Sequence, residues 1–336
     1  MHYENNNNDK FIKKDHKMNL NSVLKAIALS TVVLCTSLQA KTVYVATTAI
    51  VEHPALDAVR DGIKEVLNEN GYTGDQLKFT YESAQGQPAI AAQIARKMVG
   101  DAPDVIVAIA TPSAQAAVSA SRGIPVVFSA VTDPVGAKLV PRLIQPGGNV
   151  TGLSDMVNVR QHLALIKEFI PNLKTVGVPY NPGEANSVAI VNALKEAASE
   201  MGITIVESAA PKSSDVMIAS KQLIGKVDAI YCPTDNTIIS AFEAVVKVGI
   251  DAQVPVFAAD TGSVERGAVA AVGYDYGDLG RQTGDIVVRI LKGEKPGSID
   301  VKMAEGTSLF VNTTMAANMG VAVPADVLKR ATQIIK

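Results

Sequence analysis

Small hydroxyl, amide and carboxyl side chains follow most of the short apolar segments in this chain of 336 residues. In the first half, the candidates come after the apolar runs 105–110 and 126–128, and they are Thr111, Ser113, Ala114, Ser129, Thr132 and Asp133. In the second half, three comparable loops carry Tyr180, Glu184, Asn186, Asp235, Asn236 and Asp260. Hydroxyls and the free amides of a helix N-terminus suit an anion, whereas carboxylates suit a cation. The division between the halves therefore predicts a ligand with both a carboxylate and an ammonium group, as in an α-amino acid.

Each of these residues also has a purely structural alternative. Thr111 is a suitable N-cap with Pro112 at the first helical position, which would leave the amides of Ser113 and Ala114 free to face an anion. Asp and Glu in such loops are often only helix caps or turn formers. The number of these loops favours a ligand site, because the carboxyl ends of parallel strands meet at one edge of a sheet.

The common enzyme motifs are absent from the sequence. It has no Walker loop, no Gly-x-Gly-x-x-Gly after the first apolar segment, no Gly-x-Ser-x-Gly elbow and no His-Glu-x-x-His. His53, followed by Pro54, is the only histidine at the end of an expected strand, and we interpret it as a helix-entry residue or a ligand contact. His162 falls within a helical pattern and is expected at the surface. We therefore predict no enzymatic activity, no catalytic residue, no cofactor and no metal.

The composition excludes further classes. The formal charge is −2 and 47% of the residues are hydrophobic, so we expect a folded protein that binds no nucleic acid. Two cysteines are too few for a disulfide framework or a Cys-based zinc site, and four histidines leave little for a His-rich metal centre. We expect Cys232 to be a small buried apolar residue.

Short β-branched segments alternate with longer segments of helical period after residue 40. The expected strands are 42–46, 77–81, 105–110, 126–128, 175–178, 203–206, 229–232, 254–257 and 269–272. The expected helices are 54–70, 88–99, 160–170, 185–201, 237–250 and 277–291. This alternation predicts an α/β fold of βαβ units with parallel sheets covered on both faces.

Two doubly wound lobes follow from where the alternation is interrupted. Turn residues gather at 145–152, with about four βα units on each side. The helix at 277–291 and the extended segment 308–312 suggest that the chain crosses between lobes again near its end. We predict one lobe at 41–152 plus about 277–307, and the other at 153–276 plus about 308–336.

The first forty residues have the pattern of an exported protein. A basic segment from Met18 leads into an apolar run at 26–35 and a small residue at Ala40, which is typical of a cleaved secretory signal peptide. The run is shorter than the roughly 20 residues of a membrane-spanning helix. We expect cleavage after Ala40, Met18 as the initiator and 1–17 as an extension, with an uncleaved anchor as the alternative. Bulky Leu34 before Cys35 argues against a lipoprotein.

Seven short segments, in order, resemble the substrate-binding proteins of ABC importers of the tryptophan/tyrosine type. They are 50–57, 110–116, 131–136, 149–152, 180–187, 233–237 and 278–282, within a similarity that covers nearly all of 41–335. The resemblance implies a type I periplasmic-binding-protein fold with three interlobe crossovers. It also implies an aromatic amino-acid ligand (Trp, Tyr or Phe) that is delivered to a permease and its ATPase. From the signal peptide and the two lobes we expect an exported receptor that closes on its ligand by hinge motion, and we expect it to be a monomer.

The resemblance also implies roles for individual residues. Those near the ligand carboxylate would be Thr111, Ser113, Ser129 and Thr132. Those near the ammonium would be Glu184, Asp235 and Asp260, with Asn186 and Asn236 beside them. His53 and Pro54 would border the ligand side chain. In the family pattern, a second aromatic residue often follows the equivalent of Tyr276, but this chain has Gly277 there. This departure bears on the specificity for the ligand side chain.

Two other functions are compatible with an exported two-lobed chain. A ligand sensor that docks on a receptor kinase would share the same architecture. An exported α/β enzyme acting on a small polar substrate would need a base paired with a nucleophile, which the motifs do not supply. A repressor of similar fold is disfavoured, because a signal peptide stands where a helix-turn-helix would be.

Overall fold

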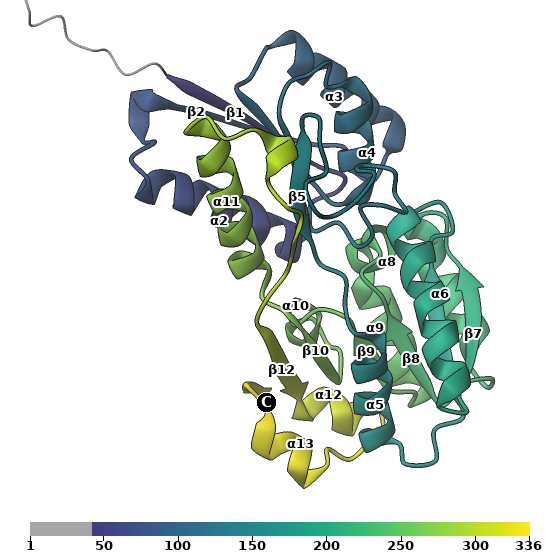
Figure 1. Cartoon of the computed structure of the whole chain (residues 1–336). Coiled ribbons are helices and arrows are strands. Elements are labelled where there is room, and N and C mark those ends of the chain that lie inside the picture. Colours follow the sequence, from purple (N-terminus) through teal and green to yellow (C-terminus); the bar gives the residue numbers. More distant parts are fainter. Residues whose placement is uncertain (1–41) are drawn as a thin grey trace, which may run out of the picture. The chain divides into compact units, whose positions relative to one another are not determined.

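Two β-sheets organise the computed structural model, which describes residues 42–336 (Figure 1). The expected signal peptide, its cleavage site and Cys35 lie outside the described residues. The first sheet has six strands in the order β11-β5-β4-β3-β1-β2, and the second has seven in the order β13-β12-β10-β9-β8-β6-β7. The predicted α/β fold with two sheet-based lobes is confirmed, whereas the residue limits proposed for each lobe stay a prediction.

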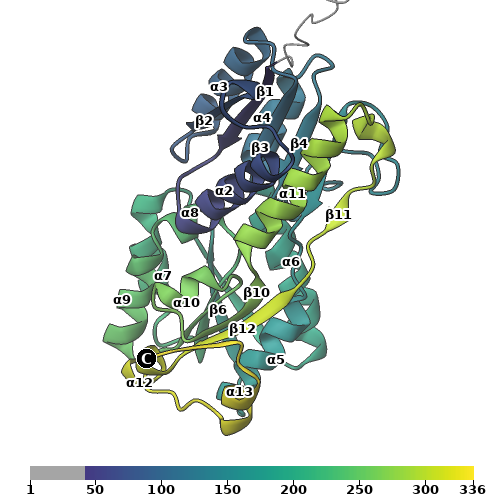
Figure 2. The same ribbon diagram turned by 90° about the vertical axis from the view of Figure 1, so that its left-hand side faces the viewer.

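The first sheet is parallel and its central strands are buried. Its strands are β1 (Val43–Ala49), β2 (Leu77–Ser83), β3 (Val105–Ile109), β4 (Val126–Ser129), β5 (Val150–Ser154) and β11 (Lys302–Met303). Its main helices are α2 (Pro54–Glu69), α3 (Pro88–Gly100), α4 (Thr111–Ala120) and α11 (Tyr276–Leu291). Helices α2 and α11 lie side by side on one face, and α3 and α4 cover the other (Figure 2). The apolar strands are thereby buried between two helical layers, as parallel sheets require.

The second sheet is parallel from β7 to β10, and its last two strands, β12 and β13, run in the opposite direction and parallel to each other. Its strands are β6 (Thr175–Tyr180), β7 (Thr204–Ala209), β8 (Ala229–Cys232), β9 (Val256–Ala258), β10 (Ala270–Tyr274), β12 (Thr307–Asn312) and β13 (Gln333–Ile335), with β12 antiparallel to β10. Its helices are α5 (Val159–Phe169), α6 (Ala185–Glu200), α7 (Val216–Leu223), α8 (Asn236–Ser240), α9 (Phe242–Ala252), α10 (Gly262–Glu265), α12 (Thr313–Asn318) and α13 (Ala325–Arg330). Short 3₁₀ turns occur at 74–76, 213–215 and 296–298.

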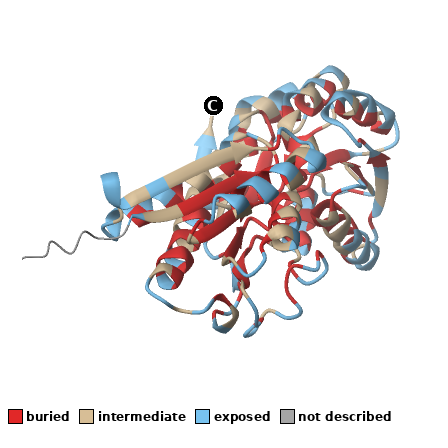
Figure 3. Ribbon diagram, turned by 90° about the horizontal axis from the view of Figure 1, so that it is seen from above, coloured by how far each residue is buried: buried red, intermediate tan, exposed pale blue. Residues whose placement is uncertain are grey.

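The chain passes between the two sheets three times: after β5, after β10 and after β11. Each sheet has its own apolar core. Figure 3 shows buried strands between helices whose outer faces are exposed. Each passage leaves one sheet at the end of a strand. The loops at those strand ends are therefore positioned to lie between the two sheets.

Several elements differ from the expectation. The last three of the expected turn residues at 145–152 belong to β5, a fully buried strand, in which Gly152 allows the backbone to lie close to the carbonyl oxygen of Phe128. The single helix expected at 237–250 is two helices, α8 and α9, separated at Ala241. Periodicity does not reveal that break, since both helices keep the same apolar spacing. Helices α7, α10, α12 and α13 were not expected, because they are short.

Candidate functional site

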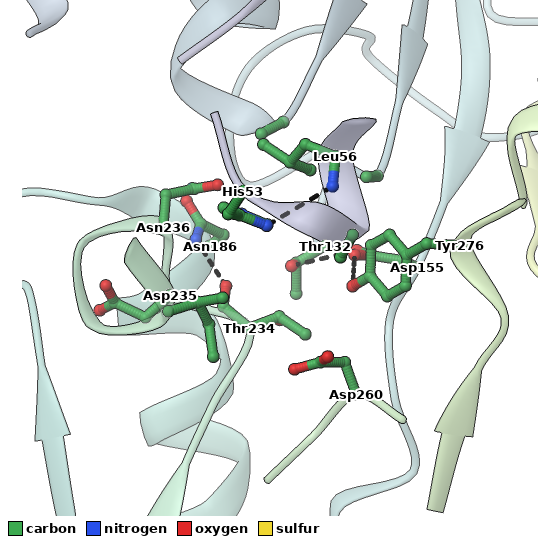
Figure 4. A pocket seen from close by; sticks show the side chains of 14 residues that line it. His53, Leu56, Thr132, Asp155, Asn186, Thr234, Asp235, Asn236, Asp260 and Tyr276 are labelled. Atoms are coloured by element: carbon green, nitrogen blue, oxygen red, sulfur yellow. Dashed lines mark hydrogen bonds between the residues drawn. The ribbon is translucent and has the colours of Figure 1, made fainter. Parts of the chain in front are cut away.

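A pocket lies between the strand ends of the two sheets (Figure 4). First-sheet segments contribute His53, Ala55, Leu56, Ala110, Ala130, Thr132 and Asp155. Second-sheet segments contribute Asn186, Thr234, Asp235, Asn236, Ile239 and Asp260, and Tyr276 begins α11. Three carboxyl groups line the pocket, and none of its described lining residues is a lysine or an arginine. The pocket therefore suits a ligand that brings a positive charge.

His53 forms the end of the pocket next to α2. Its backbone is extended, and its Nδ1 accepts a hydrogen bond from the amide of Leu56 at 3.5 Å, so the side chain caps the helix. Burial, assisted by the positive charge of Arg266, lowers the pKa of His53 to about 4. The ring is therefore neutral at pH 7, and this bond places its proton on Nε2. His53 can donate one hydrogen bond to a ligand without adding charge.

The start of α4 differs from the prediction. The helix begins at Thr111, and its N-cap is Ala110, so the expected N-cap role of Thr111 is wrong. The hydroxyls of Thr111 and Ser113 are buried and have no hydrogen-bond partner among the described residues. Ala110 lines the pocket with φ of 70° and ψ of 154°, a conformation that residues other than glycine rarely adopt.

Two buried carboxyl groups share the N-terminus of α8. Asp235 Oδ1 accepts from the amide of Ile238 at 2.9 Å, and Oδ2 accepts from the amide of Asn181 at 2.6 Å and from Ser187 Oγ at 2.5 Å. Glu184 accepts from the amides of Asn236 at 3.1 Å and Thr237 at 3.0 Å. Burial, together with the negative charge of Glu184, raises the pKa of Asp235. Both acids thus take the capping role that was their structural alternative, although Asp235 also lines the pocket.

Asp260 is the third acid of the second sheet. Its Oδ1 accepts from the amide of Ser263 at 2.9 Å and its Oδ2 from Ser263 Oγ at 2.6 Å. Burial raises the pKa of Asp260. Its two bonds come from one neighbouring residue, so each oxygen keeps capacity for a further donor.

Asp155 and Tyr276 were not among the predicted site residues. Asp155 directly follows β5 and is 2% exposed. It accepts from Tyr276 Oη at 2.9 Å and from Thr132 Oγ1 at 3.3 Å, and burial raises its pKa. The signal for Asp155 was present: it stands at a strand end, but that strand was interpreted as a turn. The position of Tyr276 was noted only for its neighbour Gly277.

The predicted site residues fall into two groups, those that line the pocket and those that do not. Those that line the pocket are His53, Thr132, Asn186, Asp235, Asn236 and Asp260. Those that are not among its lining residues are Pro54, Thr111, Ser113, Ala114, Ser129, Asp133, Tyr180 and Glu184. Sequence reasoning also missed Thr234, Leu56 and Ile239, which line it.

Some of the residues outside the lining have other partners. Ser129 Oγ is 2.7 Å from Thr283 Oγ1 on α11, and Asp133 accepts from the amide of Gly136 at 2.8 Å. A hydrogen bond with Glu207 raises the pKa of Tyr180, which places that hydroxyl beside β7.

The expected surface position of His162 is wrong. Its side chain is 4% exposed, and its Nδ1 lies 2.6 Å from Tyr231 Oη inside the second-sheet core. Helix α5 buries a wide face against β10, and that face includes His162. Cys232, by contrast, is buried as expected.

Residues 44–335 match the model of one protein family, described as "ABC transporter substrate binding protein". The chain belongs to this family. It is therefore a substrate-binding protein of an ABC transporter, in a family of binding proteins and not of enzymes. An extracytoplasmic location is implied by the family. Among the described residues, no helix is long and apolar enough to cross a membrane.

Two of the proteins similar to this chain are described with an amino-acid ligand. A tyrosine-binding protein of Clostridioides difficile is 41% identical over 264 residues, which are 78% of this chain and 76% of the relative. A Streptococcus ABC domain in complex with L-Trp is 38% identical with a TM-score of 0.85, and a Vibrio cholerae conserved domain protein is 54% identical with a TM-score of 0.86. Both matches extend over 88% of this chain and over the full length of the other chain.

A third structure differs in conformation. It is described as a ligand-free, open substrate-binding protein with adhesive properties from Clostridium difficile, and it is 40% identical with a TM-score of 0.67. It covers the same 88% of this chain as the L-Trp complex does. At nearly equal identity, the described chain thus superposes better on the ligand-bound structure than on the open one.

Proposed function

We propose that this substrate-binding protein binds an aromatic L-α-amino acid (tryptophan, tyrosine or phenylalanine) in the pocket between its sheets. The observation that carries the proposal is a pocket lined by three carboxyl groups and by apolar Leu56 and Ile239, without a lysine or an arginine among its described lining residues. An ammonium group beside the carboxyl groups and a ring against the apolar residues satisfy both features. The tyrosine and tryptophan ligands of the relatives support the same class.

The neutral groups of the first sheet suit the other end of the ligand. Backbone and side-chain donors can hold a carboxylate without a basic residue, as a helix N-terminus commonly does. His53 contributes an uncharged donor there, since its pKa is lowered to about 4. A zwitterion therefore finds carboxyl acceptors at Asp155, Asp235 and Asp260 and an uncharged donor at His53.

We further propose that the protein is exported, closes on its ligand by hinge motion and delivers it to the permease of its transporter as a monomer. The leader pattern before residue 41 and the passages between the sheets support this cycle. The motion requires a change of conformation only in the three segments that connect the sheets, and these segments form the hinge.

Binding of all twenty L-amino acids, measured by calorimetry and thermal unfolding, tests the ligand class. We expect an aromatic amino acid to stabilise the protein by about 2.7 kcal/mol at a hundredfold excess over its dissociation constant. The chain contains no tryptophan, so the fluorescence of bound L-Trp can be followed without background from the protein.

Two variants test whether a carboxyl group of the pocket contributes to binding. Asp260→Asn should weaken binding, whereas Asp326→Asn, an exposed acid of α13 paired with Lys329, should not. If no aromatic amino acid binds, the proposed ligand class is wrong.

A further inference from the structure

The four acids in and beside the pocket differ in how many of their acceptor sites the protein already uses. Glu184 and Asp235 each accept from two backbone amides that belong to other residues, and side-chain donors add to these. Asp260 accepts from one such amide and one hydroxyl. Asp155 accepts from two hydroxyls and from its own backbone amide, and the bond from Thr132 is long at 3.3 Å.

Available acceptor capacity decides which acid can serve a ligand. A carboxylate offers about four lone-pair positions, and bonds from backbone amides hold it in a fixed structural role. Glu184 and Asp235 are fixed in this way at the start of α8. Asp155 is 2% exposed, lines the pocket and has no backbone amide of another described residue among its donors. It is the acid most in need of a further donor.

The electrostatic surroundings of Asp155 favour a cation at the same place. The negative charge of Asp260 is close enough to act on Asp155, and no lysine or arginine is among the described residues that line the pocket. A positive group near Asp155 would relieve this repulsion and the cost of burying the carboxylate. Asn186 also lines the pocket, and its buried Oδ1 is an acceptor without a partner among the described residues, while its Nδ2 is bonded to Thr234 O.

Tyr276 holds Asp155 from a different part of the chain. Asp155 lies on the segment that leaves the first sheet after β5, and Tyr276 lies where the chain returns after β10 (Figure 4). The same two segments share a second bond, from Tyr274 Oη to the carbonyl oxygen of Met156 at 3.1 Å. Of these two tyrosines, however, Tyr276 is the one that bonds to the carboxyl group of Asp155. The Tyr276 bond therefore orients Asp155, whereas the Tyr274 bond only joins the segments.

We propose that Asp155 accepts the ammonium group of the ligand and that Tyr276 is the positioning residue that orients its carboxyl group. The inference rests on the proposed function for the identity of the ligand, and it adds to that function the residue that recognises the amine. It also places amine recognition on two of the segments that connect the sheets.

The test compares the affinities of L-tyrosine and of 3-(4-hydroxyphenyl)propionate, the same molecule without its amine, for four proteins. These are the wild type, Asp155→Asn, Tyr276→Phe and Tyr274→Phe. In the wild type the amine should improve affinity. Asp155→Asn should reduce affinity for L-tyrosine by about 10- to 100-fold and leave the deaminated analogue nearly unaffected, because the substitution removes the negative charge that attracts the ammonium group.

The tyrosine variants separate positioning from general support of the connecting segments. Tyr276→Phe should reduce the preference for the amine in the same direction as Asp155→Asn, by a smaller factor. Tyr274→Phe should keep the preference of the wild type. Thermal unfolding without ligand checks that each variant is folded, and Tyr276→Phe carries the test if Asp155→Asn does not fold.

Failure of this inference is distinct from failure of the proposed function. Equal losses for both ligands in Asp155→Asn, or an unchanged preference in Asp155→Asn and Tyr276→Phe, would overturn the role of Asp155 while aromatic amino acids still bind. If the wild type binds other amino acids but no aromatic one, the same comparison with the amino acid that binds and its deaminated analogue decides the role of Asp155. If no amine-bearing ligand binds, both proposals are wrong.

Discussion

Ala110 and Ala130 hold backbone conformations that favour glycine, with φ of 70° and 54°. Each follows a strand of the first sheet and lines the pocket. Residues other than glycine in such regions cost about 1–3 kcal/mol, so the surrounding structure must impose these conformations. Strain at two adjacent strand ends is typical of a binding site, because it brings backbone groups towards a ligand.

Replacing Ala110 by glycine should relieve this strain. We expect Ala110→Gly to raise the free energy of unfolding by about 1 kcal/mol, reduced by the greater freedom of glycine in the unfolded chain. Ala117→Gly, in the buried middle of α4, is the matched control and should instead lower it by about 1 kcal/mol. Urea denaturation of both variants measures the two signs, and a loss of stability in Ala110→Gly would contradict the strain.

Buried His162 makes a separate prediction about pH. Burial lowers its pKa to about 4 in the folded protein from 6.5, so between these values the unfolded chain binds more protons. The contribution of His162 to stability is complete above about pH 6.5 and is lost as the pH falls towards 4.

Comparison with His162→Gln separates the contribution of His162 from that of the buried acids. The raised pKa values of those acids change the stability with pH in the opposite direction. We expect wild-type stability to fall relative to the variant by about 3 kcal/mol between pH 7 and pH 4. Urea unfolding at several pH values measures the difference. A difference that does not change with pH would show that His162 titrates normally.

At the scale of elements, helices α2 and α11 approach each other through glycines. A Cβ atom at Gly280 would lie 2.3 Å from the carbonyl oxygen of Val59, and one at Gly62 would lie 2.4 Å from that of Gly277. Backbone atoms cannot move aside as a flexible side chain can. Because α11 starts at Tyr276, this packing also fixes where a pocket residue stands.

Gly280→Ala should therefore destabilise the protein by about 1–3 kcal/mol, although alanine is the better helix former. Gly100→Ala, at the end of α3 with no atom near the new methyl group, is the control and should be neutral or slightly stabilising. Thermal unfolding compares the pair. Equal stabilities would mean that the two helices can separate at little cost.

At the scale of the whole molecule, the two-lobed arrangement predicts a change of shape with ligand. The described chain has a TM-score of 0.85 with the L-Trp complex of its relative and 0.67 with the open, ligand-free relative. Since the pocket takes residues from both sheets, a ligand in it contacts both and favours their approach.

Small-angle X-ray scattering can detect this change. The radius of gyration should decrease when the aromatic amino acid that binds most tightly is added at saturation. An amino acid that produces no thermal shift serves as the control and should leave the radius unchanged. An unchanged radius with the saturating ligand would contradict hinge closure.

Local pattern predicted much of this fold and part of its site. The strand and helix periods of the chain indicated two α/β lobes, and strand-end position identified His53, Thr132 and Asp260, which line the pocket. The same reasoning assigned Ser129 to the ligand, although its hydroxyl is bonded to Thr283 on α11, 154 residues away. A residue's neighbours along the chain do not reveal a partner at that distance.

The sequence by itself therefore determined the alternation of strands and helices, the polar character of the strand ends and the absence of common enzyme motifs, because each depends on short-range order. Only the tertiary structure decided which acids remain available to a ligand. Glu184 and Asp235 are used by the amides of α8, and Asp155 is held by Tyr276, 121 residues further along the chain. Those assignments depend on how the sheets and their connecting segments pack, since a carboxyl group is free or engaged only with respect to the donors that folding brings to it.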